Sequence, residues 1–358
     1  MLGDSNMAKK IKLNKKGKRF FTIFGIIVVL IITIILCMNL GKKEEPIKEN
    51  KPKKESKPKV EEKLKIVDLD SKTRPYAVMI NNINVARPLQ SGLQDAYIVY
   101  ELIVEGGITR YMALFQEQST ARIGSVRSAR HYYLDYALEN DAIYVHHGQS
   151  DQAAGDFSRL SIDRIVVNNS TTGWRDRTLN VSSEHTLFTS IEKLNNGLSG
   201  LRTTREKDFL LDYSVKSLDL SGKEGSIVAN KISIPYSNYL TTSYEYDSVN
   251  KVYNRFVNGS IHKDYVTGNQ YTTKNIITYQ VNNYDLNDGS GKGRQGIDNI
   301  GSGTGYYISE GYAVPIKWSK SSREAQTKYT YSDGTEIKVN DGNTFIQIQP
   351  TGQNLTIE

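Results

Sequence analysis

The sequence predicts a layered α/β domain, preceded by one transmembrane helix and followed by a β-rich part. Residues 20–40 are apolar and uncharged, and short apolar strands alternate with helical segments between residues 67 and 225. Residues 226–358 are rich in β-branched and aromatic side chains, many at period two. We therefore divide the chain into a basic tail (1–19), an anchor (20–40), a linker (41–66), an α/β domain (67–225) and a β-rich domain (226–358).

Residues 20–40 are long enough to cross a bilayer, because about 1.5 Å per residue covers a hydrocarbon core of roughly 30 Å. The lysines and Arg19 before Phe20 predict a cytoplasmic N-terminus and a single-pass cell-membrane protein with its C-terminal domain outside. A cleaved signal peptide usually has a shorter apolar core of about 7–15 residues. A lipid anchor at Cys37 is the alternative, although the preceding Leu36 is larger than is usual before such a cysteine.

The net charge of +7 is unevenly distributed. Residues 1–66 hold 17 Lys and Arg against 7 Asp and Glu, whereas the rest of the chain holds 29 against 32. The positive charge therefore belongs to the tail and linker, and we expect no nucleic-acid partner. The linker is dominated by Lys, Glu and Pro, which predicts a solvated spacer. The single cysteine, Cys37, excludes disulfides and cysteine metal sites from the folded part.

The α/β elements follow from hydrophobic patterns and turn residues. Two apolar runs joined at Gly106-Gly107 predict a hairpin, and Ser128 and Ser150 are candidate helix N-caps. The expected strands are 74–82, 95–106, 108–117, 141–148 and 164–169, and the expected helices are 128–140, 150–160 and 182–198.

The β-rich part contains several strand-like runs, some separated by Asn-Gly or Asp-Gly turns. A glycine-rich stretch at 289–305 lacks the ending of a phosphate-binding P-loop, and we expect a flexible loop there. The runs of β-type residues are 232–237, 242–248, 251–257, 275–281, 305–318, 327–339 and 344–350.

Arginine placement is the most informative functional signal. No lysine occurs between Lys72 and Lys193, whereas this stretch holds ten of the sixteen arginines. A planar guanidinium matches phosphate or carboxylate bidentately, so the cluster predicts an anion site, although each arginine alone could pair with a nearby Asp or Glu. The ten are Arg74, Arg87, Arg110, Arg122, Arg127, Arg130, Arg159, Arg164, Arg175 and Arg177.

The sharpest motif is RIGSVRSARHYYLD, residues 122–135. We expect a loop to lead into a helix beginning near Ser128, with Arg127 and Arg130 beside its first turn. Free backbone N–H groups and the helix dipole favour an oxyanion at such a place. Asp135 is expected to orient an arginine or to lie on the helix face.

Other polar residues are candidates for binding the same ligand. His146 and His147 are adjacent in a strand, so they point to opposite faces and cannot share a metal. Glu101 and Glu105 share a strand face, where they could pair with Arg110 or perform acid–base or metal chemistry. The substrate-binding candidates are Arg110, His147, Ser150, Arg175, Arg177 and His185.

The strings DAYIVYELIVEGGITRYMALF, RIGSVRSAR, HHGQSD and WRDRTLNVSSEHTLFT resemble the YerB-like family of bacterial lipoproteins. The segments GYAVPIKWSK and YSDGTEIKVNDGNTFIQIQP resemble its C-terminal part, so the likeness covers about residues 70–350. It implies a two-part envelope protein of Gram-positive type, with no established activity. Family members have Pro where this chain has Ser125, and Pro-His-Asn where it has 184–186, which puts a role of His185 in doubt.

A looser likeness is to the LytR–CpsA–Psr enzymes, which transfer glycopolymers from a polyprenyl-pyrophosphate carrier to peptidoglycan. The matching order is Asp95, then Arg127 and Arg130, then residues 147–150. This resemblance implies that the arginines grip pyrophosphate and form a catalytic set with Asp95. Asp95 would then assist a Mg²⁺ ion or act as a base.

These observations leave three classes of function open. The first is an envelope protein that binds a phosphate-type anion and transfers a glycopolymer or polyprenyl pyrophosphate. The second is a non-catalytic module that holds a cell-wall glycopolymer or a lipid-linked phosphate. The third is a scaffold for cell-wall synthesis proteins. The sequence alone does not decide whether the chain is an enzyme or requires a metal.

Overall fold

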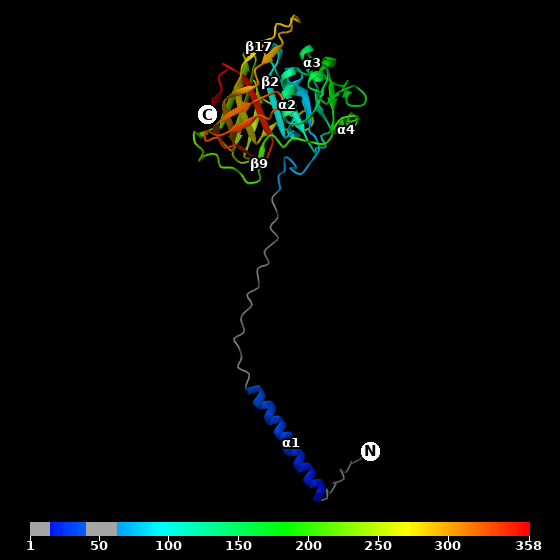
Figure 1. Cartoon of the computed structure of the whole chain (residues 1–358), viewed down its shortest axis with the longest axis vertical. Coiled ribbons are helices and arrows are strands. Elements are labelled where there is room, and N and C mark those ends of the chain that lie inside the picture. The colour runs from blue at the N-terminus through cyan, green and yellow to red at the C-terminus, as the bar shows by residue number, and fades with distance from the viewer. Residues whose placement is uncertain (1–14, 41–62) are drawn as a thin grey trace, which may run out of the picture. The chain divides into compact units, whose positions relative to one another are not determined.

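The computed structural model describes residues 15–40 and 63–358 (Figure 1). The tail lysines before residue 15 and linker residues 41–62 lie outside the described residues. The chain divides into two compact units, residues 1–61 and 62–358. In the first unit, α1 (Lys15–Leu40) is one continuous helix that is long and apolar enough to cross a membrane.

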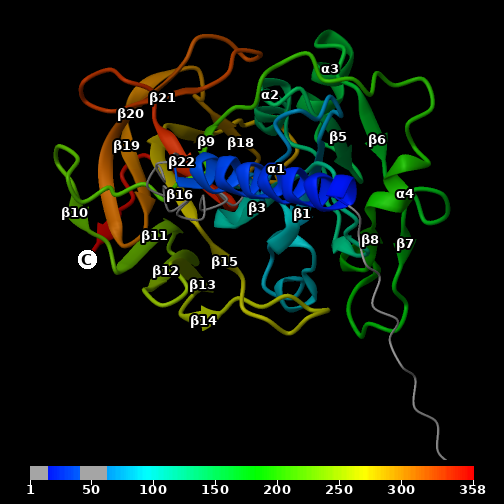
Figure 2. The same ribbon diagram turned by 90° about the horizontal axis from the view of Figure 1, so that it is seen from below.

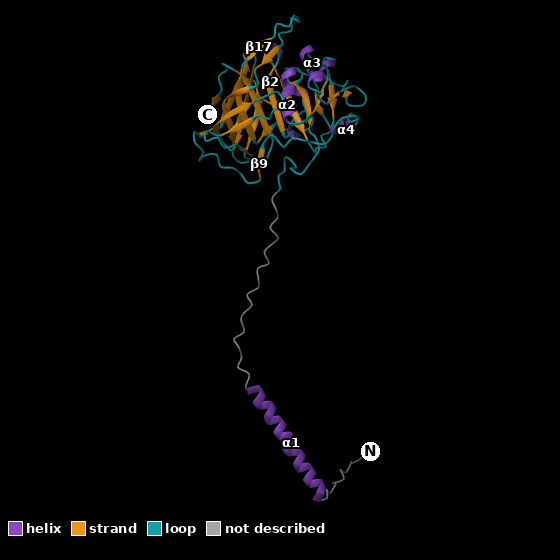
Figure 3. Cartoon of the chain, viewed as in Figure 1, coloured by secondary structure: helices purple, strands orange, loops and turns teal. Residues whose placement is uncertain are grey.

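Eleven strands of the second unit form one mixed sheet, the largest in the described residues, and short helices accompany its N-terminal half (Figure 3). The predicted fold class, α/β followed by a β-rich part, is therefore confirmed. The strands run in the order β10 (Ile227–Val228), β20 (Tyr312–Lys320), β19 (Gly301–Ser309), β16 (Asn275–Val281), β23 (Thr344–Pro350), β2 (Ile98–Ile103), β3 (Thr109–Phe115), β1 (Tyr76–Asn81), β5 (Ile143–His146) and β6 (Arg164–Val166), with β21 (Lys328–Thr330) beside β20.

This sheet crosses the expected boundary near residue 225. β23, from the end of the chain, lies between β2 and β16 and is parallel to both. In Figure 2 the C-terminal strands β19 to β21 lie at one end of the sheet, and β5 and β6 lie at the other. The two sequence halves therefore share one sheet.

The remaining strands form smaller sheets. The second sheet has six strands: β14 (Ser260–Ile261), β13 (Val252–Val257), β12 (Leu240–Asp247), β11 (Lys231–Ser237), β24 (Thr356–Ile357) and, beside β13, β15 (Thr272–Thr273). The others are β17 (Asn283–Asp285) with β18 (Gln295–Ile297), β9 (Asp212–Ser214) with β22 (Lys338–Asn340), and β4 (Ile123–Gly124) with β8 (Leu187–Thr189) and β7 (Trp174–Arg175).

The helices of this unit are short. Ser150 caps α3 as expected, since its side chain accepts a hydrogen bond from the Ala153 N–H. The α-helices are α2 (His131–Glu139), α3 (Asp151–Arg159) and α4 (Ile191–Asn195), and the 3-10 helices are η1 (Arg87–Leu89), η2 (Leu93–Asp95), η3 (Glu105–Gly107) and η4 (Ser183–His185).

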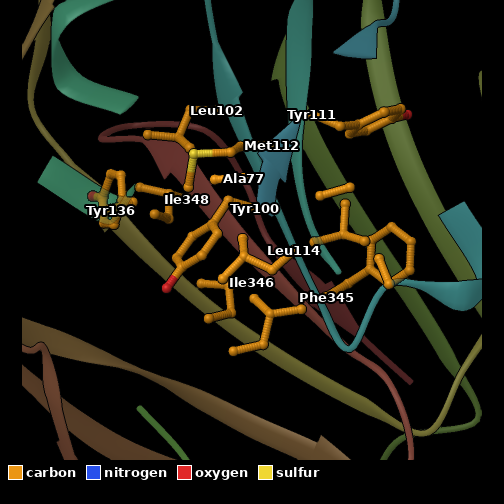
Figure 4. Packing of buried hydrophobic residues seen from close by; sticks show 14 of the residues in the cluster. Ala77, Tyr100, Leu102, Tyr111, Met112, Leu114, Tyr136, Phe345, Ile346 and Ile348 are labelled. Atoms are coloured by element: carbon orange, nitrogen blue, oxygen red, sulfur yellow. The ribbon is translucent and has the colours of Figure 1, made fainter. Parts of the chain in front are cut away.

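Buried side chains from both halves make one core around the centre of the large sheet. Figure 4 shows Tyr100 of β2, Leu114 of β3 and Ile346 of β23 in the same packed cluster. β2 and β23 bury every residue, as expected for strands covered on both faces. Hydrophobic burial therefore joins the two sequence halves in addition to the backbone pairing of their strands.

Three expectations about local structure were wrong. The helix predicted for 182–198 is η4, β8 and the five-residue α4, because β8 pairs with β4 and β7. The helix predicted from Ser128 begins at His131, because the Ala129 N–H is bonded to the Gly148 carbonyl. The predicted flexible loop at 289–305 contains β18 and the start of β19.

Candidate functional site

Several predicted site residues gather at the carboxyl ends of β1 and β5. These strands are parallel neighbours, and the segment before α2 lies across their ends. The Arg127 N–H donates to the Met79 carbonyl at 2.9 Å, and the His147 N–H donates to the Arg127 carbonyl at 3.1 Å. Ligands commonly bind at the carboxyl ends of strands in α/β sheets. We name the group Arg110, Arg127, Arg130, His147, Arg175, Glu105 and Glu184 the arginine edge.

Glu105 is bound by two of these arginines. Arg130 holds both carboxylate oxygens, with its Nε at 2.8 Å from Oε2, and Arg110 Nη2 lies 3.0 Å from Oε1. Burial would raise the pKa of Glu105, but the hydrogen bond from Arg130 and both positive charges lower it to about 2. Burial and the charge of Arg130 also lower the pKa of Arg110, to about 10. Pairing with Arg110, one of the expected roles of Glu105, is thus present.

Arg127 contacts an acidic residue from another loop. Its Nη2 donates to Glu184 Oε2 at 2.8 Å, and the Glu184 side chain is 53% exposed. His185 lies beside this pair and is buried, with Nδ1 3.0 Å from Asn81 Nδ2. Burial lowers the pKa of His185, and its contact with Asn81 is that of a structural residue.

His147 and Arg175 contact each other at the same edge. The His147 ring has Nδ1 2.8 Å from the Val167 carbonyl and Nε2 3.3 Å from Arg175 Nη2. A proton on Nδ1 therefore leaves Nε2 to accept from the arginine. Arg175 also donates to the Ser183 carbonyl, which holds the loop carrying Glu184.

Two other candidates lie in simpler surroundings. The Ser150 hydroxyl is used as the cap of α3 and the residue is buried. Arg177 is exposed and has no ion pair within residues 15–40 and 63–358. Among the described residues, neither Ser150 nor Arg177 forms a hydrogen bond with a residue of the arginine edge.

Most of the other arginines stabilise the fold. Arg74 is buried with Asp141 and Asp163, and Arg159 pairs with Asp156 within α3. Asp135, on α2, pairs with Arg323, while burial raises the pKa of this carboxyl to about 6 despite that charge. The exclusive use of arginine is thus explained in part by ion pairs.

Asp95 lies in a separate cavity of about 430 Å³. This cavity is lined by residues of both sequence halves, including Arg122 but neither Arg127 nor Arg130. Asp95 Oδ2 accepts a hydrogen bond from Thr120 Oγ1 at 2.7 Å. The structure therefore brings Asp95 together with Arg122 of the 122–135 motif, but not with Arg127 and Arg130. The described part of the chain contains no group of three or more His, Cys, Asp or Glu side chains that could hold a metal ion.

One buried polar cluster was not predicted, because Glu101 pairs with Arg255 and not with Arg110. Glu101 and Arg255, both fully buried, form an ion pair with Oε2–Nη2 at 2.7 Å. Arg255 also donates from Nε to His262 Nδ1 at 3.1 Å, and His262 contacts Gln90. The position of Glu101 within an apolar run was the available signal, because a buried carboxylate requires a cationic partner.

Comparison with known proteins identifies the family. Residues 64–204 match the N-terminal domain, and residues 232–346 the C-terminal domain, of the family described as "Protein of unknown function (DUF3048)". The chain belongs to this family. Both domains are present in order and together cover most of the folded unit.

A named relative and a solved structure agree with this assignment. The chain is 29% identical over 294 residues to "Putative lipoprotein YerB" of Bacillus subtilis, covering 78% of this chain and 82% of the relative. The crystal structure of YerB from Bacillus subtilis matches with a TM-score of 0.68 and 28% identity, covering 80% of this chain and 94% of that one. The YerB-like resemblance is therefore confirmed, whereas these matches give the LytR–CpsA–Psr likeness no support. The lipoprotein relative and α1 together indicate membrane association.

Proposed function

We propose that this protein is a membrane-anchored module that binds an anionic, phosphate-type ligand of the cell envelope at the arginine edge. The observation that carries the proposal is the excess of positive charge at the carboxyl ends of β1 and β5. Four arginines gather there, and two carboxylates, Glu105 and Glu184, contact three of them. Arg110 is close enough to Arg130 and Arg127 for their charges to help lower its pKa.

Unused donors support the same proposal. The Nε atoms of Arg110 and Arg127 have no hydrogen-bond partner among the described residues. Glu184 is more than half exposed, so an incoming phosphate could displace it from Arg127 at little cost. A phosphate oxygen would then gain charge-assisted hydrogen bonds.

Binding is favoured over transfer by the position of Asp95. A transferase of glycopolymer or polyprenyl pyrophosphate needs a base or a metal ion beside the gripped phosphate. Asp95 lines a different cavity, and Glu105 at the edge is held as an anion by two arginines. The arrangement therefore fits a module that binds its ligand without reacting with it. Transfer of a glycopolymer or polyprenyl pyrophosphate is the second candidate function.

The proposed anchor places the folded unit outside the cell. The basic residues before the apolar core of α1 favour a cytoplasmic N-terminus and a single crossing. External protease should then digest the folded unit in intact cells and leave an N-terminal reporter untouched. Fatty-acid labelling that disappears in Cys37→Ser would instead show lipid attachment at Cys37.

The anion site is tested by Arg127→Lys in the full chain in detergent. The substitution keeps the charge but removes the planar fork, so the Kd for inorganic pyrophosphate should rise about tenfold, which corresponds to about 1.4 kcal/mol. The matched control is Arg159→Lys, because the Arg159 side chain is 67% exposed and pairs within α3. Titration calorimetry gives Kd and thermal melting gives stability. A strongly lowered Tm with unchanged pyrophosphate binding would contradict the proposal.

A further inference from the structure

The cavity that contains Asp95 is the second feature with ligand-binding chemistry. It is formed where η2 and the segment before β4 face the loop between β14 and β15. The Gln94 amide binds the backbone of Thr272 across this junction, accepting from its N–H at 2.9 Å and donating to its carbonyl at 3.2 Å. The walls are thus fixed to each other, and a volume of about 430 Å³ is in the range of small-molecule sites.

An unpaired carboxylate lies on one wall. Asp95 is exposed, and the only hydrogen bond of its carboxylate within the described ranges comes from Thr120. It has no ion pair with any described residue, so its negative charge is available to a ligand. The second carboxylate of the wall, Asp264, is already used, since it accepts from the Gly92 N–H at 2.8 Å and from the Tyr271 hydroxyl at 2.9 Å.

The guanidinium group of Arg122, which also lines the cavity, has hydrogen-bond donors without partners among the described residues. Arg122 donates from Nη1 to Asp176 Oδ2 at 2.9 Å, and its carbon Cζ lies 3.6 Å from the centre of the Phe188 ring. Its Nε and Nη2 are buried and have no hydrogen-bond partner in the part of the chain that the structure describes. These two N–H groups lie along one side of the guanidinium plane, which is the arrangement that a carboxylate binds bidentately.

A buried hydroxyl adds a third observation that indicates a ligand. Ser91 lines the cavity and is only 1% exposed, and its Oγ lacks a partner among the described residues. Buried polar atoms in folded proteins are nearly always hydrogen-bonded. Ser91 and Arg122 thus leave three unpaired polar atoms in the wall of a single cavity.

We propose that this cavity binds a small zwitterion, a free amino acid or a dipeptide. The ammonium group pairs with Asp95, the carboxylate binds the Nε–Nη2 side of Arg122, and Ser91 Oγ hydrogen-bonds the ligand. Because these two nitrogens are buried, the carboxylate is admitted by a movement of Tyr265, which is 46% exposed and whose ring centre lies 5.1 Å from Arg122 Cζ. This site is separate from the arginine edge and does not depend on the anion proposal.

The test is calorimetric titration of the full chain in detergent with four probes. Alanine and alanyl-alanine carry both charges, whereas ethylamine and propionate each carry one. We expect one of the two zwitterions to bind at least tenfold more tightly than either single-charge probe. The tighter of the two identifies an amino-acid or a dipeptide site. Ethylamine or propionate binding as tightly as the zwitterions, or no binding of alanine and alanyl-alanine, would overturn the proposal.

Variants locate the site. Asp95→Asn should weaken binding of the preferred zwitterion at least tenfold, whereas Asp70→Asn, at an exposed carboxylate outside the cavity, should not. Ser91→Ala removes only a hydroxyl and should weaken binding severalfold, which keeps the proposal testable if Asp95→Asn melts early. Excess pyrophosphate should leave alanine binding unchanged, because pyrophosphate is proposed to bind at the arginine edge and not in this cavity. Unaltered zwitterion affinity in both Asp95→Asn and Ser91→Ala would rule the site out.

Discussion

Glu101 lies in β2 and Glu105, four residues later, lies in η3, the turn that follows this strand, and the surroundings of the two side chains differ. Glu101 is fully buried and pairs with Arg255, which comes from the second sheet. Glu105 has a side chain that is 22% exposed and is bound by Arg110 and Arg130 at the arginine edge. One glutamate therefore joins the two sequence halves, whereas the other holds a positive cluster together near the surface.

The difference shows why an arginine–glutamate pair does not by itself reveal function. In the Glu101 cluster the carboxylate also accepts hydrogen bonds from Thr109 and Thr242, so nothing is left for a ligand. At Glu105 the charges do not balance, because two arginines share one carboxylate. A ligand site is indicated by surplus charge and unused donors, and only the second cluster has them.

The largest expected effect comes from breaking the buried pair. Arg255→Met leaves the Glu101 carboxylate without its cation, and the free energy of unfolding should fall by about 3–5 kcal/mol. Urea unfolding measures it. The double variant Glu101→Gln with Arg255→Met should recover part of the loss, because no charge stays buried. Equal losses in the single and double variants would contradict a dominant charge effect.

The second effect is a loss of folding stability at acidic pH that is caused by protonation of Glu105. Its pKa of about 2 lies below the ordinary 4.5, so folding favours the ionised form. The resulting stability is present above about pH 4.5 and is lost as the pH falls through about 2, with a maximum of about 3 kcal/mol. Glu105→Gln should remove it at pH 7 and flatten the acid limb of stability against pH. Parallel acid limbs for the two proteins would show that Glu105 is not the source.

A smaller effect separates capping from binding at Ser150. Ser150→Ala removes the acceptor for the Ala153 N–H and should destabilise the protein by about 1 kcal/mol. Pyrophosphate affinity should not change, because this hydroxyl is occupied by the helix. A weaker pyrophosphate affinity at unaltered Tm would instead show that the Ser150 hydroxyl contacts the ligand.

The smallest effect is expected at Arg177. This side chain is exposed and unpaired within the described ranges, so Arg177→Ala should change stability by no more than about 0.5 kcal/mol. Thermal melting checks this value. If pyrophosphate binding nevertheless weakens severalfold, Arg177 reaches the bound ligand and the positive surface extends beyond β7.

Local signals predicted much of the fold. The hairpin around Gly106-Gly107 and the helix capped by Ser150 are encoded within a few residues, and both are present. The helix expected at 182–198 was wrong because Leu187–Thr189 pairs with strands outside its own segment. Tertiary pairing overrides helix propensity in such cases.

The candidate site was less accessible to sequence reasoning. The motif 122–135 led to Arg127 and Arg130, but nothing in it shows that Glu105 and Glu184 would contact them. Asp95 and Arg122 share a cavity because the 264–272 region folds over them, and that contact spans more than a hundred residues. Long-range partners of this kind require the topology of the sheet.

The position of β23 has a consequence for biogenesis. Thr344–Pro350 is synthesised after both β2 and β16, yet it supplies the strand that lies between them. Until it arrives, both neighbours present open edges of unpaired N–H and carbonyl groups, which invite aggregation. The large sheet therefore closes only after β23 has been synthesised. Premature stop codons before residue 344 should yield proteolytic fragments rather than a stable N-terminal domain.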